Sequence, residues 1–225
     1  MRKGNVMKTI AANSERGMTL IEVVIALLVI AVLALMVAIL PVISRSHRPG
    51  EIRNNCFNNL RQIELALKVW AVDNNDRFPM QVTSSEGGTL EASLSGRAFE
   101  TFLVMSNELS AMKLVICPTD SKKTVARSFG DMRSGNVSYF IGVDVTDTNL
   151  SAFLVGDRNL ALDDVPVAPG LSSFATNSLP GWTAEMHVKQ GNVGLGDGSV
   201  MQFSVNKLRD ELSHTGFVTN RLAVP

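Results

Sequence analysis

The 225-residue sequence lacks a surplus of charge of either sign, because 21 Lys and Arg residues balance 21 Asp and Glu residues. A basic nucleic-acid binder or an acidic disordered tail would show such a surplus, so the composition excludes a nucleic-acid partner. Cysteine is scarce, with two residues, and no HExxH, CxxC or nucleophile-elbow motif occurs. We therefore expect a protein that is not an enzyme and does no chemistry itself.

Aromatic residues are also few, and all of them follow position 41. The first forty residues have a different character, because residues 18–40 are apolar except for Thr19 and Glu22. A helix of this length is roughly 35 Å long, which is enough to cross a bilayer. Residues 41–225 have the composition of a soluble domain. The sequence thus predicts a membrane-tethered globular domain, with membrane lipid around the apolar helix.

The charges before the apolar run orient it in the membrane. Four positive residues and one acid, Glu15, precede it; the positive residues are Arg2, Lys3, Lys8 and Arg16. The positive-inside rule places this end in the cytoplasm and the globular domain on the other side of an inner membrane, in the periplasm or outside the cell. The run is too long for an ordinary secretory signal. A plain signal anchor would explain its length but not the membrane carboxylate of Glu22, which is costly.

Residues 15–22 explain that carboxylate. Glu15-Arg16-Gly17-Met18-Thr19-Leu20-Ile21-Glu22 resembles the cleavage and methylation site of type IV prepilins and type II secretion pseudopilins. The resemblance implies that prepilin peptidase removes residues 1–17 by cutting between Gly17 and Met18, and that Met18 is then methylated. It also implies assembly with other pilin or pseudopilin subunits on an inner-membrane platform. Most members carry Phe where this chain has Met18.

Glu22 has two interpretations. An unpaired carboxylate in hydrocarbon is costly, so pairing with the Met18 amino group of a neighbouring subunit would neutralise both charges and set the stagger between subunits. The alternative is an acid that merely reaches the membrane interface.

Residues 41–79 are predicted to form an amphipathic stem helix and a turn. Pro41 is a point where the helix can kink, and Pro49-Gly50 interrupts it before a restart at Glu51. One apolar stripe then follows helical spacing: Ile52, Cys56, Leu60, Ile63, Leu67 and Trp70. The polar turn at 73–79 lacks the spacing of an EF-hand calcium loop.

Two further segments extend the resemblance. Residues 52–79, and the spacing from His187 to Asp197-Gly198, resemble pseudopilin-like proteins abundant in planctomycetes and verrucomicrobia, which end in an "H-X9-DG" segment. Here that segment is 187–198, within a predicted β-rich domain at 80–225.

The rest of the chain has β-like patterning. We predict strands at 113–117, 137–145, 152–155, 182–188, 192–196 and 199–205, with a two-residue turn at Asp197-Gly198 and a long loop at 163–181. The predicted fold class is α+β and pilin-like, with a long N-terminal helix packed on an antiparallel sheet.

Two candidate sites follow from these elements. His187 is expected to hydrogen-bond across a strand pair and fix its register, and no cofactor is required. The alternative is a calcium site built from Asp157, Glu185, His187 and Asp197, although one histidine is weak evidence for a metal. Cys56 and Cys117 lie on the oxidising side, so they form either a disulfide or two buried thiols.

The sequence therefore predicts a structural pseudopilin or minor pilin of a type II secretion or type IV pilus-like assembly. The alternative is a membrane-anchored periplasmic domain that binds glycan, calcium or a secreted substrate and uses the pilin-type leader only for processing.

Overall fold

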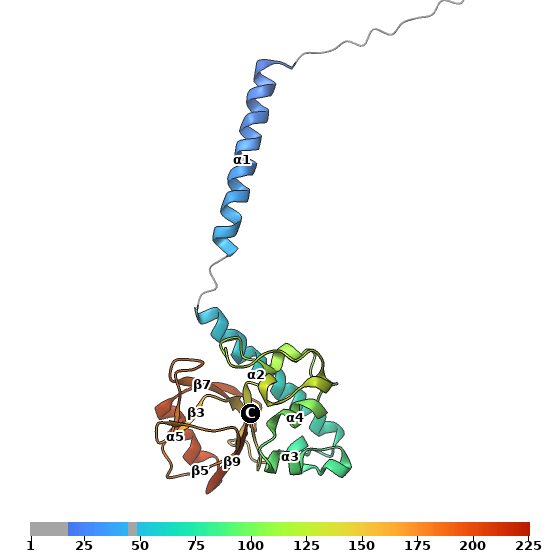
Figure 1. Ribbon diagram of the computed structural model, residues 1–225, viewed down its shortest axis with the longest axis vertical. Helices are drawn as coiled ribbons and strands as arrows, with labels where there is room; N and C mark the ends of the chain where they lie inside the picture. The colour runs from blue at the N-terminus through green and yellow to red at the C-terminus, as the bar shows by residue number, and fades with distance from the viewer. Residues whose placement is uncertain (1–17, 45–48) are drawn as a thin grey trace, which may run out of the picture. The chain divides into compact units, whose positions relative to one another are not determined.

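The computed structural model describes residues 18–44 and 49–225, and the chain divides into two units (Figure 1). The first unit ends at His47 and contains one described helix, α1 (Leu20–Ser44). The second unit, from Arg48 to Pro225, contains all the other described elements. The predicted leader, residues 1–17, lies outside the described residues.

Helix α1 contains an 18-residue window, Leu20–Val37, that is long and apolar enough to cross a membrane. None of this window is buried within the protein. An exposed apolar surface is unfavourable in water. Helix α1 therefore requires apolar surroundings, which the other described residues do not provide. The helix continues through Pro41 to Ser44, beyond the end predicted at position 40. Pro41 has no N–H to donate to the carbonyl four residues earlier. Because it lies in the last turn, the helix ends soon after this missing hydrogen bond.

Helix α2 (Pro49–Asp73) begins two residues before the predicted restart at Glu51. Proline fits the first turn of a helix, because the N–H that it lacks would have no helical partner there. The described part of the predicted apolar stripe is buried: Cys56, Leu60, Ile63, Leu67 and Trp70. The helix ends before Asn75 and Asp76, whose φ values of 59° and 57° are left-handed and cannot continue it.

The main sheet of the second unit has six antiparallel strands in the order β5-β9-β1-β2-β7-β8. A second sheet has three strands in the order β4-β3-β6. In chain order the strands are β1 (Tyr139–Gly142), β2 (Phe153–Asp157), β3 (Leu160–Leu162), β4 (Val165–Pro166), β5 (Gly170–Ala175), β6 (Pro180–Trp182), β7 (Gln190–Leu195), β8 (Val200–Ser204) and β9 (Thr219–Val224). The predicted α+β class, with an apolar N-terminal helix and an antiparallel sheet, is confirmed.

The main sheet separates two hydrophobic cores. Because side chains alternate along a strand, Tyr139 and Ile141 of β1 join the core that contains the α2 stripe, whereas Phe140 joins the other core. That second core also contains Leu208 and Leu212 of helix α5 (Val205–His214). In Figure 1, α5 and several strands lie on one side of the second unit, and two short helices, α3 (Leu90–Leu94) and α4 (Ala98–Val104), lie on the other.

Strand β7 and the turn after it approach α2 closely because they present glycines to it. A Cβ atom on Gly194 would lie 2.1 Å from Glu64 Oε1, so no larger residue fits without a shift. Lys68 Nζ donates a hydrogen bond to Gly196 O at 2.9 Å. Gly198 has a φ of 89°, a conformation that glycine adopts without strain. Glycines therefore allow the strand to run along the helix.

Several predicted strands were wrong. Residues 113–117 contain a 3₁₀ helix, η3 (Met112–Val115), instead of a strand. Only Trp182 of the predicted strand 182–188 belongs to a strand, because Val188 and Lys189 have φ values of 52° and 57°, which turn the chain out of the extended conformation. The predicted loop at 163–181 contains β4, β5 and part of β6.

Other elements were not foreseen. They are β3, β9, α3, α4, α5, η1 (Pro79–Gln81), η2 (Ser84–Glu86), η4 (Phe129–Asp131) and η5 (Ser134–Asn136). The start of helix α5 has a recognisable sequence signal, because Ser204 is its N-cap residue: Ser204 Oγ accepts a hydrogen bond from Lys207 N at 3.3 Å.

Candidate functional site

The predicted processing site lies at the start of α1. Gly17 is outside the described residues, whereas Met18 is described and its side chain is exposed. Glu22 lies in the first turn, and its Oε2 atom accepts hydrogen bonds from Thr19 N at 2.8 Å and Thr19 Oγ1 at 2.9 Å. This is the reach of a capping-box acid back to the N-cap residue. Glu22 therefore has a role within its own helix that the sequence-based interpretation did not include.

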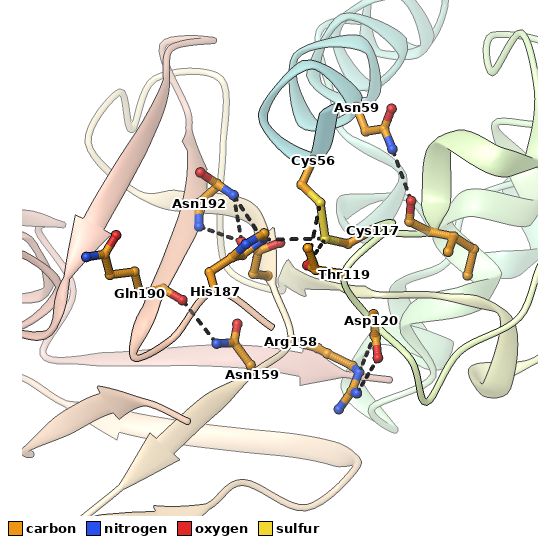
Figure 2. The surroundings of a disulfide bond; sticks show 12 residues. Cys56, Asn59, Cys117, Thr119, Asp120, Arg158, Asn159, His187, Gln190 and Asn192 are labelled. Carbon is orange, nitrogen blue, oxygen red and sulfur yellow. Dashed lines mark hydrogen bonds and ion pairs between the residues drawn. A yellow bond between two sulfur atoms is a disulfide. The ribbon is translucent and has the colours of Figure 1, made fainter. Parts of the chain in front are cut away.

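A disulfide bond joins Cys56 of α2 to Cys117, which is 61 residues away in the sequence (Figure 2). Both cysteines are fully buried. Of the two alternatives, the structure contains the disulfide and not the pair of thiols. The bond fixes α2 to the segment after η3 in the core beneath the helix.

His187 contacts this disulfide from the segment before β7. Its Nε2 atom lies 3.4 Å from Cys117 Sγ (Figure 2). The same atom lies 3.3 Å from Asp157 Oδ2. Asp157 Oδ2 also accepts hydrogen bonds from Asn192 N at 2.6 Å and Asn192 Nδ2 at 2.8 Å. These residues are buried, and we call Cys56, Cys117, Asp157, His187 and Asn192 the buried polar cluster.

The expected role of His187 needs correction. It lies outside the strands, so it does not bridge a strand pair from within a ladder. It instead contacts Asp157 at the end of β2 and lies 3.4 Å from Asn192 Nδ2 on β7. These two strands pair with each other, so His187 closes the end of an existing ladder.

The predicted four-residue calcium site is divided in the structure. Asp157 and His187 meet, but the other two residues lie elsewhere. Glu185 forms ion pairs with Lys122 and with Arg158, whose Nη1 atom lies 3.4 Å from Glu185 Oε2. Asp197 lies in the turn between β7 and β8. The four side chains therefore do not form one ligand set.

The turn at Asp197 is longer than predicted. Leu195 N donates to Ser199 O at 2.9 Å, so the loop comprises three residues, 196–198, instead of two. Gly198 N donates to Leu195 O at 2.9 Å, and Asp197 Oδ1 accepts from Ser199 N at 2.8 Å. A type I turn followed by a left-handed glycine is the usual three-residue hairpin connection.

Arg158 and Asp120 form an ion pair that sequence reasoning missed. Arg158 Nε and Nη2 donate to the two Asp120 oxygens at 2.7 Å and 2.6 Å (Figure 2). Burial acts to raise the pKa of Asp120, but the hydrogen bonds and charge of Arg158 outweigh it and hold this pKa below its ordinary value. The pKa of Glu185 is also lowered, first by its hydrogen bond from Lys122.

Glu64 is the second missed residue. Its side chain is 2% exposed on the buried face of α2, and neither carboxyl oxygen has a hydrogen-bond partner within the described residues. Burial raises its pKa from 4.5 to about 8, with a smaller opposing effect of Lys68. A carboxyl group four residues after Leu60 of the stripe was a readable signal, since such residues share a helix face.

Comparison with known families bears on the N-terminal segment. A model of the prokaryotic N-terminal methylation motif matches residues 12–38. The chain carries this motif. The motif covers the Gly17–Met18 junction, Glu22 and most of α1. No curated protein and no solved structure matches the chain.

Proposed function

We propose that the protein is a structural subunit, a pseudopilin or minor pilin, of a type II secretion or type IV pilus-like assembly. The observation that carries this proposal is the methylation motif on α1, whose apolar window has no cover within the chain. Prepilin peptidase would cut between Gly17 and Met18, and the new amino group of Met18 would be methylated. The His187-to-Gly198 segment supports kinship with pseudopilin-like proteins that end in H-X9-DG.

The exposed helix provides the route to assembly. Inner-membrane lipid would cover α1 before assembly, and the α1 helices of other subunits would cover it in the filament. The globular unit would remain on the periplasmic side. Removal of residues 1–17 leaves 17 positive and 20 negative residues, so the orienting positive charge is discarded with the leader.

Glu22 would select the position of the neighbouring subunit. In this proposal its carboxylate pairs with the methylated Met18 amine of the next subunit, which removes two unpaired charges from hydrocarbon. The hydrogen bonds from Thr19 already hold the carboxylate at the start of the helix. Pairing and capping are therefore two separate demands on one side chain.

Two substitutions separate these demands. Glu22→Gln keeps an oxygen that can accept from Thr19 N but removes the charge, whereas Glu22→Ala removes both. If pairing is essential, both variants insert and are processed, yet neither enters filaments seen by electron microscopy of cells. If Glu22 only caps the helix, Glu22→Gln assembles normally and the pairing proposal fails.

Processing is tested independently by mass spectrometry of the N-terminus. The expected mature chain begins at Met18 and carries one added methyl group. Cells without prepilin peptidase provide the control, since they should retain residues 1–17. A chain that begins at Met1 in wild-type cells would contradict the proposed function.

A further inference from the structure

We propose that the chain with both cysteines reduced binds zinc through Cys56, Cys117, His187 and Asp157. The two Sγ atoms and one His187 ring nitrogen lie within 4.8 Å of one another. Asp157 Oδ2 lies 3.3 Å from His187 Nε2. Three donors thus lie together at one buried point and Asp157 lies next to one of them; the four residues come from α2, the segment after η3, the segment before β7 and β2.

The spacing of these donors suits a tetrahedral ion. Zinc binds thiolate sulfur at about 2.3 Å, and histidine nitrogen and carboxylate oxygen at about 2.0–2.2 Å, so adjacent ligand atoms lie about 3.3–3.8 Å apart. The distance from His187 Nε2 to Cys117 Sγ, 3.4 Å, falls in this range, and Asp157 lies beside the same nitrogen, with Oδ2 at 3.3 Å. Reduction removes the bond that holds the two sulfur atoms together, so their separation can increase, and the Asp157 side chain must move towards them to complete the ligand set.

Neighbouring groups would orient the ligands. Asn192 donates two hydrogen bonds to Asp157 Oδ2, while Asp157 Oδ1 is buried and has no hydrogen-bond partner within the described residues. A carboxylate held by one oxygen and open at the other is a suitable monodentate ligand. Thr119 Oγ1 lies 2.9 Å from Cys117 Sγ, where its hydroxyl can donate to a thiolate.

Zinc and the disulfide exclude each other, because the disulfide uses both sulfur atoms in a covalent bond. Binding of Zn²⁺ to the reduced chain replaces two thiol protons, which leave to solvent, and forms two Zn–S bonds. The ion would connect the same parts of the fold that the disulfide connects. Zinc would thus hold α2 to the sheet in chains that have not been oxidised.

The test uses the full chain in detergent, reduced with a phosphine and kept free of oxygen, and titrated with Co²⁺ alone. We expect one equivalent to bind with sulfur-to-cobalt charge-transfer bands and the visible bands of a tetrahedral ion, and Zn²⁺ to displace it. His187→Ala and Asp157→Asn should each weaken Co²⁺ binding at least tenfold. His214→Ala, which removes an exposed histidine of α5, should leave the titration unchanged.

Each contrary result would overturn the proposal. A reduced chain that is folded by circular dichroism but gives no charge-transfer bands would do so. So would a titration that His187→Ala and Asp157→Asn leave unaltered. If reduction alone unfolds the globular unit, zinc must refold it, because metal binding would then supply folding free energy; failure to refold would exclude the site.

Discussion

Replacing Glu64 with Gln should remove a large part of the pH dependence of stability. Glu64 is buried between α2 and β7, and burial raises its pKa from 4.5 to about 8 in the folded protein. Because the folded pKa is the higher one, the folded state binds the proton more tightly than the unfolded state. The contribution of Glu64 to the free energy of unfolding is therefore at its maximum below about pH 4.5 and declines as the pH rises towards 8.

The size of the effect follows from the two pKa values. They differ by about 3.5, and one unit corresponds to about 1.4 kcal/mol, so ionising Glu64 costs about 5 kcal/mol more in the folded state than in the unfolded state. Between pH 5 and pH 8 this linkage should lower the free energy of unfolding by roughly 3–4 kcal/mol. Glutamine has nearly the same shape and does not ionise, so Glu64→Gln should lose this component.

The measurement is urea unfolding of the full chain at constant detergent concentration, followed by the fluorescence of the buried Trp70 and Trp182 at several pH values. The diagnostic quantity is the difference between the pH slopes of the variant and the parent. A constant offset is irrelevant, since the buried amide brings one more donor than the protonated acid and can shift stability equally at every pH. Asp73→Asn, which changes an exposed carboxyl on the same helix, is the matched control.

A specific result would refute this reasoning. If Glu64→Gln and the parent lose stability in parallel from pH 5 to pH 8, Glu64 does not take up a proton on folding. The same conclusion follows if Asp73→Asn changes the slope as much as Glu64→Gln does.

Three further predictions concern the same unit. Cys117→Ser opens a disulfide-closed loop of 61 residues and should lower the free energy of unfolding by about 4 kcal/mol in urea titrations; an unchanged midpoint would contradict this. Gly194→Ala places a Cβ atom 2.1 Å from Glu64 Oε1 and should cost roughly 1–3 kcal/mol, most of it recovered when Glu64→Ala is added. Asp120→Asn should cost about 2 kcal/mol near pH 7, because Arg158 loses the more buried of its two charged partners, Asp120 and Glu185. The pKa of Asp120 is depressed, so the parent's advantage should fade below about pH 3.8, and an advantage that persists in acid would count against the ion pair.

The sequence predicted elements where local pattern and final environment agree. Helix α1 is a continuous apolar run and α2 carries an apolar stripe at helical spacing. Strands β1, β2, β7 and β8 are rich in branched, aromatic or turn-forming residues. Strand β5 has weakly apolar residues because it lies at the edge of the sheet, with only Phe174 fully buried. Such a strand is recognisable only once β9 is available to pair with it.

The candidate site was predictable only in part, for a similar reason. The sequence grouped Asp157, Glu185, His187 and Asp197 as one possible site, but only Asp157 and His187 meet in the structure. The roles of Asn192 and Glu64 depend on which face of β7 meets α2. That choice is made by tertiary packing, which no local pattern specifies.

The spacing from His187 to Gly198 is explained by the way β7 lies against α2. The six residues of β7 extend about 20 Å, and the helical rise from Cys56 to Lys68 is about 18 Å. At one end His187 contacts the disulfide on Cys56, and at the other Lys68 donates to Gly196 O and lies against Gly198. Strand and helix therefore match in length, with a polar anchor at each end and Glu64 against Gly194 between them. A change in the number of residues between the two anchors would release one of them, so in this chain the spacing from His187 to Gly198 is a packing requirement of the interface between α2 and β7.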